Sequence, residues 1–145
     1  MAYLCDTNVI SASSRPGGTA SEVAEWLDLA SDRIWISTMT VAEIRHGIAK
    51  LRGDGAERKA RHFEDWLGGI ERFYAARILP LDLRAAHVLG DLMDAARRAG
   101  HVPGLADLII AATARVHDLI VVTRHVRHFE RLGAPVLNPF ETLPD

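Results

Sequence analysis

Short apolar runs typical of β-strands alternate along the chain with segments whose apolar residues recur at helical spacing. The runs predicted as strands are 3–5, 34–36, 78–81, 119–123 and 136–137. The main predicted helices are 23–30, 41–51, 56–77, 83–99, 106–117 and 126–132. Parallel neighbours can be joined only through a crossover connection, so this alternation predicts an α/β fold with a parallel sheet and helices on both of its faces.

Length and composition fit one globular domain. At 145 residues the chain has the usual size of a single domain, and we expect one domain over residues 1–145. Hydrophobic residues make up 48% and charged residues 25%, which excludes a disordered tail, a collagen-like fibre and a disulfide scaffold. Glycines mark two expected boundaries, a break at Gly68–Gly69 within helix 56–77 and a left-handed cap at Gly100.

The apolar runs and the cysteine content favour a cytoplasmic protein. No apolar run in the sequence approaches the roughly 18 residues that a membrane-spanning helix needs. The start of the chain lacks the basic region of a signal peptide and meets Asp6 early. Cys5 is the only cysteine, so an internal disulfide is impossible, and we interpret it as a small buried strand residue. We expect no membrane partner.

The net charge of −2 is unevenly distributed but identifies no partner. Residues 45–77 carry eight basic and five acidic side chains, whereas residues 1–44 carry two basic and six acidic ones. A basic segment is compatible with phosphate contacts. It is also typical of a solvated helix surface, which is the interpretation that composition alone favours.

Three acidic residues are expected at one edge of the predicted sheet. Asp6 follows the first strand, Glu43 lies in the first turn of the helix after the second, and Asp107 opens the helix before the fourth. Ligands of such sheets bind outside the carboxyl ends of the strands, so the three carboxylates can converge on one cleft. Each also has a structural interpretation: Asp6 as a helix cap near Asn8, Glu43 in a capping box with Thr40, and Asp107 as a charge at a helix N-terminus.

Three carboxylates in one cleft point to the chemistry of a divalent metal ion. They repel one another and lose hydration, so they tend toward protonation unless a cation compensates. Hard ions such as Mg²⁺ or Mn²⁺ take oxygen ligands and bind substrate phosphates, and they lower the pKa of a bound water. No serine elbow, glycine-rich phosphate loop or zinc-spaced histidine pair in the sequence favours another chemistry.

Segments spread in order over almost the whole chain resemble one protein family. They are residues 4–11 (LCDTNVIS), 37–44 (STMTVAEI), 106–114 (ADLIIAATA), 121–124 (VVTR) and 137–140 (LNPF). Together they resemble PIN-domain ribonucleases, in particular the VapC toxins of bacterial toxin–antitoxin pairs. The Asn-Pro-aromatic ending is similar to that of the FitB-like subgroup.

The resemblance implies a three-layer α/β/α sandwich around a central parallel sheet, and cleavage of RNA with Mg²⁺ or Mn²⁺. It places catalysis and metal binding on Asp6, Glu43 and Asp107. Asp6 and Asp107 are the expected direct ligands, and Glu43 either coordinates the ion or holds a metal-bound water. Thr7 and Thr123 match hydroxyl positions that orient a carboxylate or a water, with ordinary turn and strand-end hydrogen bonding as an equal alternative.

The same resemblance implies three partners. These are an RNA substrate, a VapB-like antitoxin with a segment that fills the catalytic groove, and a second copy of the chain in a homodimer. Helix 56–77 carries an apolar stripe that is explained mostly by core packing, and helices of this region in the family also contribute to dimerisation and to antitoxin binding. The residues of this stripe are Phe63, Trp66, Leu67, Ile70, Phe73 and Tyr74.

The sequence departs from the family where a fourth acid is usual. After Thr123-Arg124 the family carries an acid at one of two positions, which here are His125 and His128, with Phe129 in its expected place. A histidine there could bind a softer ion such as Mn²⁺, contact an RNA phosphate or leaving oxygen when protonated, or face solvent, and we favour the last two. We predict that a second metal site is weakened or absent.

Other charged side chains have two interpretations. Basic residues just after the fourth strand, and two more one turn beyond Glu43, can draw RNA toward the acids or can simply face solvent. They are Arg124, His125, Arg127, His128 and Arg131, and Arg45 and His46. Asp118 precedes its strand and is a poor substitute for the missing acid. We interpret Asp91 and Asp94 as surface charges on a helix.

We interpret the chain as a metal-dependent endoribonuclease and the toxin of a type II toxin–antitoxin system. One alternative is a PIN fold whose altered fourth motif has cost it catalysis, so that it acts by binding RNA or antitoxin. Another is a phosphoacceptor receiver domain, which is also α/β with an aspartate at a strand end. That class needs a lysine after a late strand, and neither Lys50 nor Lys59, the only lysines, is so placed.

Overall fold

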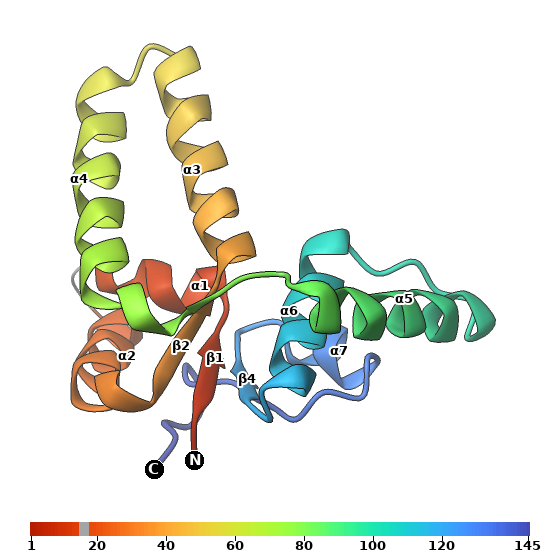
Figure 1. Cartoon of the computed structure of the whole chain (residues 1–145). Helices are drawn as coiled ribbons and strands as arrows, with labels where there is room; N and C mark the ends of the chain where they lie inside the picture. The colour runs from red at the N-terminus through yellow and green to blue at the C-terminus, as the bar shows by residue number, and fades with distance from the viewer. Residues whose placement is uncertain (15–17) are drawn as a thin grey trace.

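In the computed structural model, which describes residues 1–14 and 18–145, five parallel strands form a central sheet of order β3-β2-β1-β4-β5 (Figure 1). The strands are β1 (Tyr3–Cys5), β2 (Ile34–Ser37), β3 (Ile78–Leu79), β4 (Ile120–Val122) and β5 (Val136–Leu137). The helices are α1 (Thr7–Ile10), α2 (Gly18–Leu29), α3 (Thr38–Gly53), α4 (Glu57–Phe73), α5 (Leu83–Arg98), α6 (Leu105–Val116) and α7 (Val126–Glu130). The predicted fold class is confirmed.

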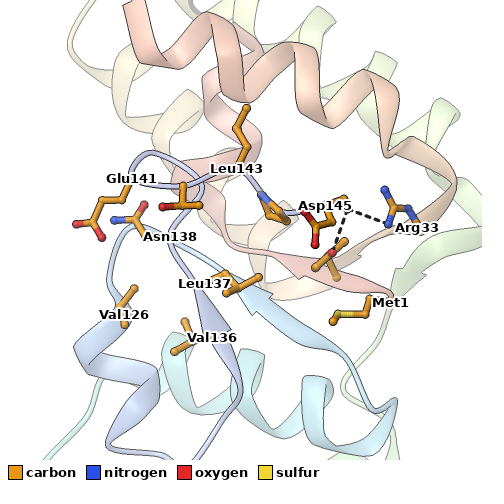
Figure 2. A pocket seen from close by; sticks show the side chains of 12 residues that line it. Met1, Arg33, Val126, Val136, Leu137, Asn138, Glu141, Leu143 and Asp145 are labelled. Atoms are coloured by element: carbon orange, nitrogen blue, oxygen red, sulfur yellow. Dashed lines mark hydrogen bonds between the residues drawn. The ribbon is translucent and has the colours of Figure 1, made fainter.

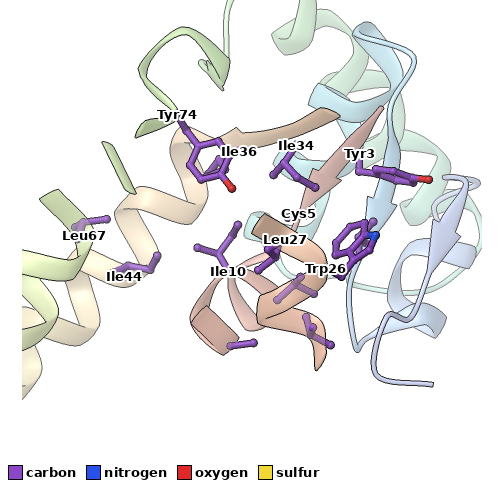
Figure 3. Close-up of a cluster of buried hydrophobic side chains, with 14 of the residues drawn as sticks. Tyr3, Cys5, Ile10, Trp26, Leu27, Ile34, Ile36, Ile44, Leu67 and Tyr74 are labelled. Carbon is purple, nitrogen blue, oxygen red and sulfur yellow. The ribbon is translucent and has the colours of Figure 1, made fainter. Parts of the chain in front are cut away.

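Side-chain alternation along the central strand β1 separates two hydrophobic layers. Tyr3 and Cys5 are buried on one face against apolar residues of α1, α2, α3 and α4 (Figure 3). Leu4 points to the other face, where it packs with residues of α5, α6 and α7, such as Leu92 and Phe129. The sheet is therefore covered on both faces, which gives the three layers that the family resemblance implies.

Helices α3 and α4 form an antiparallel hairpin that extends beyond the carboxyl ends of the strands (Figure 1). Helices α5 and α6 pack against the opposite face of the sheet. Ile44 and Ile48 of α3 and Leu67 of α4 are buried in the base of the hairpin. Both ends of the chain lie at the opposite edge of the sheet. Asp6 and Glu43, which come after β1 and β2, therefore lie at this carboxyl edge of the sheet.

Several predicted boundaries differ from the structure, and those of α4 and β3 have a clear physical reason. Helix α4 runs unbroken through Gly68–Gly69 to Phe73, so the predicted break is wrong and the helix ends earlier than residue 77. The two glycines weaken a helix by about 1 kcal/mol each relative to alanine, and the burial of Leu67 and packing of Ile70 beside them offset this. The third strand is shorter than predicted and ends before Pro80, which has no N–H for the ladder.

Gly100 and Cys5 lie where the sequence places them. Gly100 follows α5 with φ +76°, the left-handed conformation predicted for a helix end. Cys5 is fully buried in β1, and this burial raises the pKa of its thiol above the usual range. Among residues 1–14 and 18–145, no helix is both long enough and apolar enough to cross a membrane.

Candidate active site

Asp6 occupies the junction between β1 and α1. Its backbone N–H continues the ladder to β4 through the Val122 carbonyl (2.9 Å), and its Oδ1 caps α1 by accepting the Thr7 backbone N–H (2.8 Å). The Thr123 hydroxyl donates to Oδ2 at 2.8 Å, and the Asn8 amide donates to the same atom at 3.1 Å. Only 5% of Asp6 is exposed. The carboxylate is therefore fixed in orientation and largely removed from water.

Glu43 lies on α3 and is tied to the start of α1. The helix begins at Thr38 and is capped by the Ser37 hydroxyl, so the predicted capping box between Thr40 and Glu43 is wrong and Glu43 lies in the second turn. Its Oε1 instead accepts a hydrogen bond from the Thr7 hydroxyl at 2.8 Å. This contact joins the element after β1 to the element after β2, at the same edge of the sheet.

Asp107 lies in the first turn of α6 and is bonded to a histidine. Its Oδ2 is 2.9 Å from Nδ1 of His128 in α7. The ring of His128 stacks on the ring of His125, with 5.1 Å between ring centroids and 13° between ring planes. The backbone N–H of His125 donates to the Thr123 hydroxyl at 3.0 Å. None of the roles that the sequence suggested for the two histidines includes this contact with Asp107.

The three acids influence one another electrostatically. Burial raises the pKa of Asp6, hydrogen bonds from Thr123 and Thr7 lower it, and the charge of Asp107 raises it further. Burial also raises the pKa of Glu43, the hydrogen bond from Thr7 lowers it, and the charges of Asp6 and Asp107 raise it again. Across the described ranges 1–14 and 18–145, no three Asp, Glu, His or Cys side chains meet as a ready-made set of ligands.

Basic side chains contribute to two hollows around α7, and Asp107 lines one of them. Arg124, His125, Arg127 and His128 contribute to the lining of one of about 500 Å³. His128 and Arg131 line the other, of about 290 Å³, together with Asp107. His128 and Arg131 therefore lie next to Asp107.

Arg124 is held on both its backbone and its side chain. Its backbone N–H donates to Oδ1 of Asn8 at 3.0 Å, and its guanidinium lies 4.0 Å from the centre of the Phe140 ring. Such a cation–π contact fixes the direction of a side chain that is otherwise exposed. Arg45, in contrast, forms an ion pair with Glu64 at 3.0 Å.

Sequence reasoning did not single out Asn8 and Phe140. Asn8 contacts Asp6, the Thr123 hydroxyl and the Arg124 backbone, so it joins β1 to the segment after β4. Its position two residues after Asp6, in the turn that starts α1, was the available signal. Phe140 had no such signal beyond its place in the Asn-Pro-aromatic ending, because the sequence does not show that this ending packs against Arg124.

Acids elsewhere do not replace the missing fourth carboxylate. Asp94 forms ion pairs with Arg97 (2.7 Å) and Arg98 (3.1 Å) on the exposed face of α5. Asp118 comes directly before Leu119 and β4, at the amino end of that strand. Neither residue lies with the acids that follow β1 and β2.

The segments that form this edge belong to a recognised domain type. The sequence pattern of the PIN domain matches residues 3–135. The chain belongs to the PIN-domain family. The predicted family is therefore confirmed, and the receiver-domain alternative is excluded. PIN-domain ribonucleases generally depend on divalent metal ions.

Relatives of this PIN domain align over nearly its full length. It is 38% identical over 138 residues to VapC ribonuclease Y4jK of Sinorhizobium fredii, which covers 94% of this chain and 96% of the relative. It is also 38% identical to Toxin FitB of Neisseria gonorrhoeae, covering 94% and 97% of the two chains. The crystal structure of FitAcB from Neisseria gonorrhoeae superposes with a TM-score of 0.82 at 36% identity, over 95% and 98% of the chains.

Proposed function

We propose that this PIN domain is a metal-dependent endoribonuclease, the toxin of a type II toxin–antitoxin pair, with Asp6, Glu43 and Asp107 as its catalytic residues. The observation that carries the proposal is that Thr7 donates its backbone N–H to Asp6 and its hydroxyl to Glu43, each at 2.8 Å, while Asp107 lies close enough for its charge to raise the pKa of both acids. Like charges gathered this way destabilise the fold unless a cation binds there. The names of the relatives, a ribonuclease and a toxin, support the same function.

The oxygen donors at this edge fit Mg²⁺ or Mn²⁺. These ions prefer carboxylate oxygens, and Mg²⁺ keeps several waters while binding one or two carboxylates and substrate phosphates. Asp6 and Asp107 would hold the ion, so a preformed triad of ligands is not required. Oε1 of Glu43 accepts a hydrogen bond from the Thr7 hydroxyl at 2.8 Å. Glu43 would coordinate the ion through its other carboxylate oxygen or hold a water molecule beside the ion.

The side chains around the ion would each have a separate role in hydrolysis. When bound, the ion lowers the pKa of a water molecule and neutralises charge that develops on the phosphate. Thr123 keeps Asp6 oriented through its 2.8 Å hydrogen bond, and Thr7 does the same for Glu43. Glu43 has a raised pKa, which suits it to hold the attacking water and take up a proton from it.

Arg124, His125 and His128 would contact the RNA backbone. All three line the hollow of about 500 Å³, and His128 also contacts Asp107. The Arg124 guanidinium, placed on the Phe140 ring, presents donors that match a phosphate group in geometry and charge. Such contacts bring a strand to the metal but do not read its sequence.

A VapB-like antitoxin would occupy the groove that leads to Glu43. A hollow of about 230 Å³ there is lined by Thr7 and Glu43 and by apolar side chains of the α3–α4 hairpin, including Phe63 and Trp66. An inserted segment with apolar residues and one basic side chain would fit both parts. We further propose a homodimer and a cytoplasmic location, which suits a chain whose single thiol is buried and unpaired.

RNA cleavage by the purified chain, freed of antitoxin, tests the proposal. We expect cleavage of a structured RNA with Mg²⁺ or Mn²⁺ and none in EDTA. Asp6→Asn and Asp107→Asn should each reduce the rate by about 100-fold or more, since each removes a metal ligand. Asp91→Asn makes the same change at an exposed carboxylate on α5. It is the matched control and should cleave RNA like the wild type. Equal cleavage by the wild type and Asp6→Asn would identify a contaminating nuclease and contradict the proposal.

His128 favours a second candidate function. Its place at the position of the usual fourth acid leaves one carboxylate fewer for a metal ion, which fits a PIN domain with weakened catalysis that binds RNA or antitoxin instead. RNA binding without detectable cleavage at any divalent ion concentration would establish that alternative. We also expect a second metal site to be weak or absent, and calorimetric titration that shows two tight Mg²⁺ sites would contradict this.

A further inference from the structure

A continuous chain of contacts runs from Asp6 to Asp107 through the segment between β4 and α7. The Thr123 hydroxyl donates to Asp6 and accepts the His125 backbone N–H. The His125 ring stacks on His128, whose Nδ1 is 2.9 Å from Asp107 Oδ2. Asp6 follows β1 and Asp107 lies in α6, 101 positions further along the sequence, yet four consecutive contacts join them.

We propose that His128 is a positioning residue, which orients the Asp107 carboxylate toward the metal, and that His125 holds the His128 ring in place for this task. This role rests on the proposed metal site, which the two histidines would support. Where the family usually has a fourth acid, this chain would use a hydrogen-bonded histidine pair to fix the acid it already has.

The geometry requires the pair rather than His128 alone. A carboxylate accepts, so Nδ1 of His128 is the donor in its contact with Asp107. The His128 side chain is 56% exposed and that of Asp107 is 22% exposed, and an isolated contact between such exposed groups holds little orientation. The stacked ring of His125 limits the rotation of His128. His125 is in turn anchored by its backbone N–H to the Thr123 hydroxyl, and so to Asp6.

Asp107 depends on this contact more than Asp6 depends on any one of its own. Asp6 accepts hydrogen bonds from Thr7, Asn8 and Thr123. In the part of the chain that the structure describes, His128 is the one hydrogen-bond partner of the Asp107 carboxylate. A ligand held by its surroundings loses less conformational freedom when the ion binds. Loss of His128 should therefore weaken metal binding, and not merely change the rate of cleavage.

Calorimetric titration of the purified full chain with Mn²⁺, without RNA, measures this effect directly. His128→Phe keeps a ring that can stack on His125 but removes the Nδ1 donor, and we expect Mn²⁺ to bind about tenfold more weakly. His128→Asn places an amide donor near the position of Nδ1, and we expect binding within about threefold of the wild type. Equal or tighter binding by His128→Phe would overturn the proposal.

Two further variants show whether the pair acts through Asp107. In an Asp107→Asn background, His128→Phe should cause no additional loss of Mn²⁺ affinity, and an additional loss would contradict a role through Asp107. His125→Ala should weaken binding in the wild type but not in a His128→Ala background, because the stacking partner is then absent; independent, additive losses would overturn the role of His125.

The same titrations separate this inference from the proposed function. If Asp107→Asn binds Mn²⁺ as tightly as the wild type, the metal site itself is wrongly assigned and both ideas fail. If Asp107→Asn weakens binding and His128→Phe does not, only the positioning role fails. Circular dichroism and the thermal midpoint of each variant verify that it is folded at the titration temperature, and His128→Asn provides the rescue that a merely disrupted fold would not show.

Discussion

The two ends of β1 face very different surroundings. At its carboxyl end, Asp6 is buried, and this burial and the charge of Asp107 raise its pKa. At its amino end, Tyr3 and Arg33 border a hollow of about 660 Å³ (Figure 2). This hollow is larger than each of the three hollows described above. There, Arg33 donates to the backbone carbonyl of Asp145 at 3.0 Å, and the Tyr3 hydroxyl donates to the same oxygen at 3.4 Å.

The difference shows that hollow size does not identify the functional edge of this PIN domain. The amino-end contacts pair two donors with one backbone acceptor, so they serve the fold. The carboxyl end holds like charges whose pKa values are raised by burial and by one another. Substitutions at the carboxyl end should therefore change metal binding and activity, and substitutions at the amino end should change stability alone.

After Asp6→Asn and Asp107→Asn, the largest effect is expected for Thr123→Val. Its hydroxyl donates to Asp6 and accepts the His125 backbone N–H and the Asn8 amide. An isosteric valine leaves these buried groups without their partner, which should reduce the free energy of unfolding by about 1–3 kcal/mol. Because the hydroxyl lowers the pKa of Asp6, its loss raises that pKa further. We expect RNA cleavage to fall by about 10–100-fold.

Thr113→Val is a matched control for this variant. Thr113 is also fully buried, but its hydroxyl donates to the Ile109 carbonyl within α6, where the backbone hydrogen bond of the helix remains. Chemical denaturation and cleavage assays of both variants separate a general loss of a buried hydroxyl from a specific effect at the site. A Thr123→Val enzyme that is as active as Thr113→Val would remove Thr123 from the catalytic network.

A smaller effect, visible only as a pH dependence, is expected for Glu43→Gln in EDTA. The pKa of Glu43 is raised in the folded chain, so between its unfolded and folded pKa values the folded state binds more protons. The stability of the wild type therefore falls as pH rises through that window and stays lower above it. Glutamine can still accept from Thr7 and carries no charge. We expect Glu43→Gln to gain stability relative to the wild type from low to neutral pH.

Denaturation curves at several pH values measure this gain, with Glu25→Gln on the exposed side of α2 as the control. Saturating Mg²⁺ should reduce the advantage of Glu43→Gln at neutral pH, because the ion stabilises the charged wild-type site. A difference between the two proteins that does not vary with pH would show that the charge of Glu43 is not disfavoured by the fold.

The sequence was sufficient to predict the elements whose signal is local. Parallel strands show as short apolar runs, and the family motifs place Asp6, Glu43 and Asp107 after or before particular strands. The unbroken α4 was not predictable, because the packing of Leu67 and Ile70 that offsets two glycines depends on the opposite helix. The details of the candidate site also depend on contacts that the sequence does not show.

Contacts between distant segments set the details that sequence reasoning missed. The bond between His128 and Asp107 requires α6 and α7 to pack with a particular offset, and 21 positions separate the two residues. The contact of Arg124 with Phe140 requires the segment after β5 to bring Phe140 against the hydrophobic cluster that contains Tyr3 and Cys5. Residue types at these positions are compatible with several surroundings, and only the tertiary structure selects one.

The smallest effect is expected for Arg33→Gln at the amino end of the sheet. This change removes a hydrogen bond to the Asp145 carbonyl and a guanidinium that lies 5.7 Å from the centre of the Tyr3 ring. Both contacts are near solvent, so the free energy of unfolding should fall by about 0.5–1 kcal/mol in denaturation experiments. RNA cleavage and Mn²⁺ affinity should stay unchanged, because the strand β1 itself is fixed by ladders to β2 and β4. A clear loss of either property would mean that the amino-end contacts control the position of Asp6 through β1, and that the two ends do not act independently.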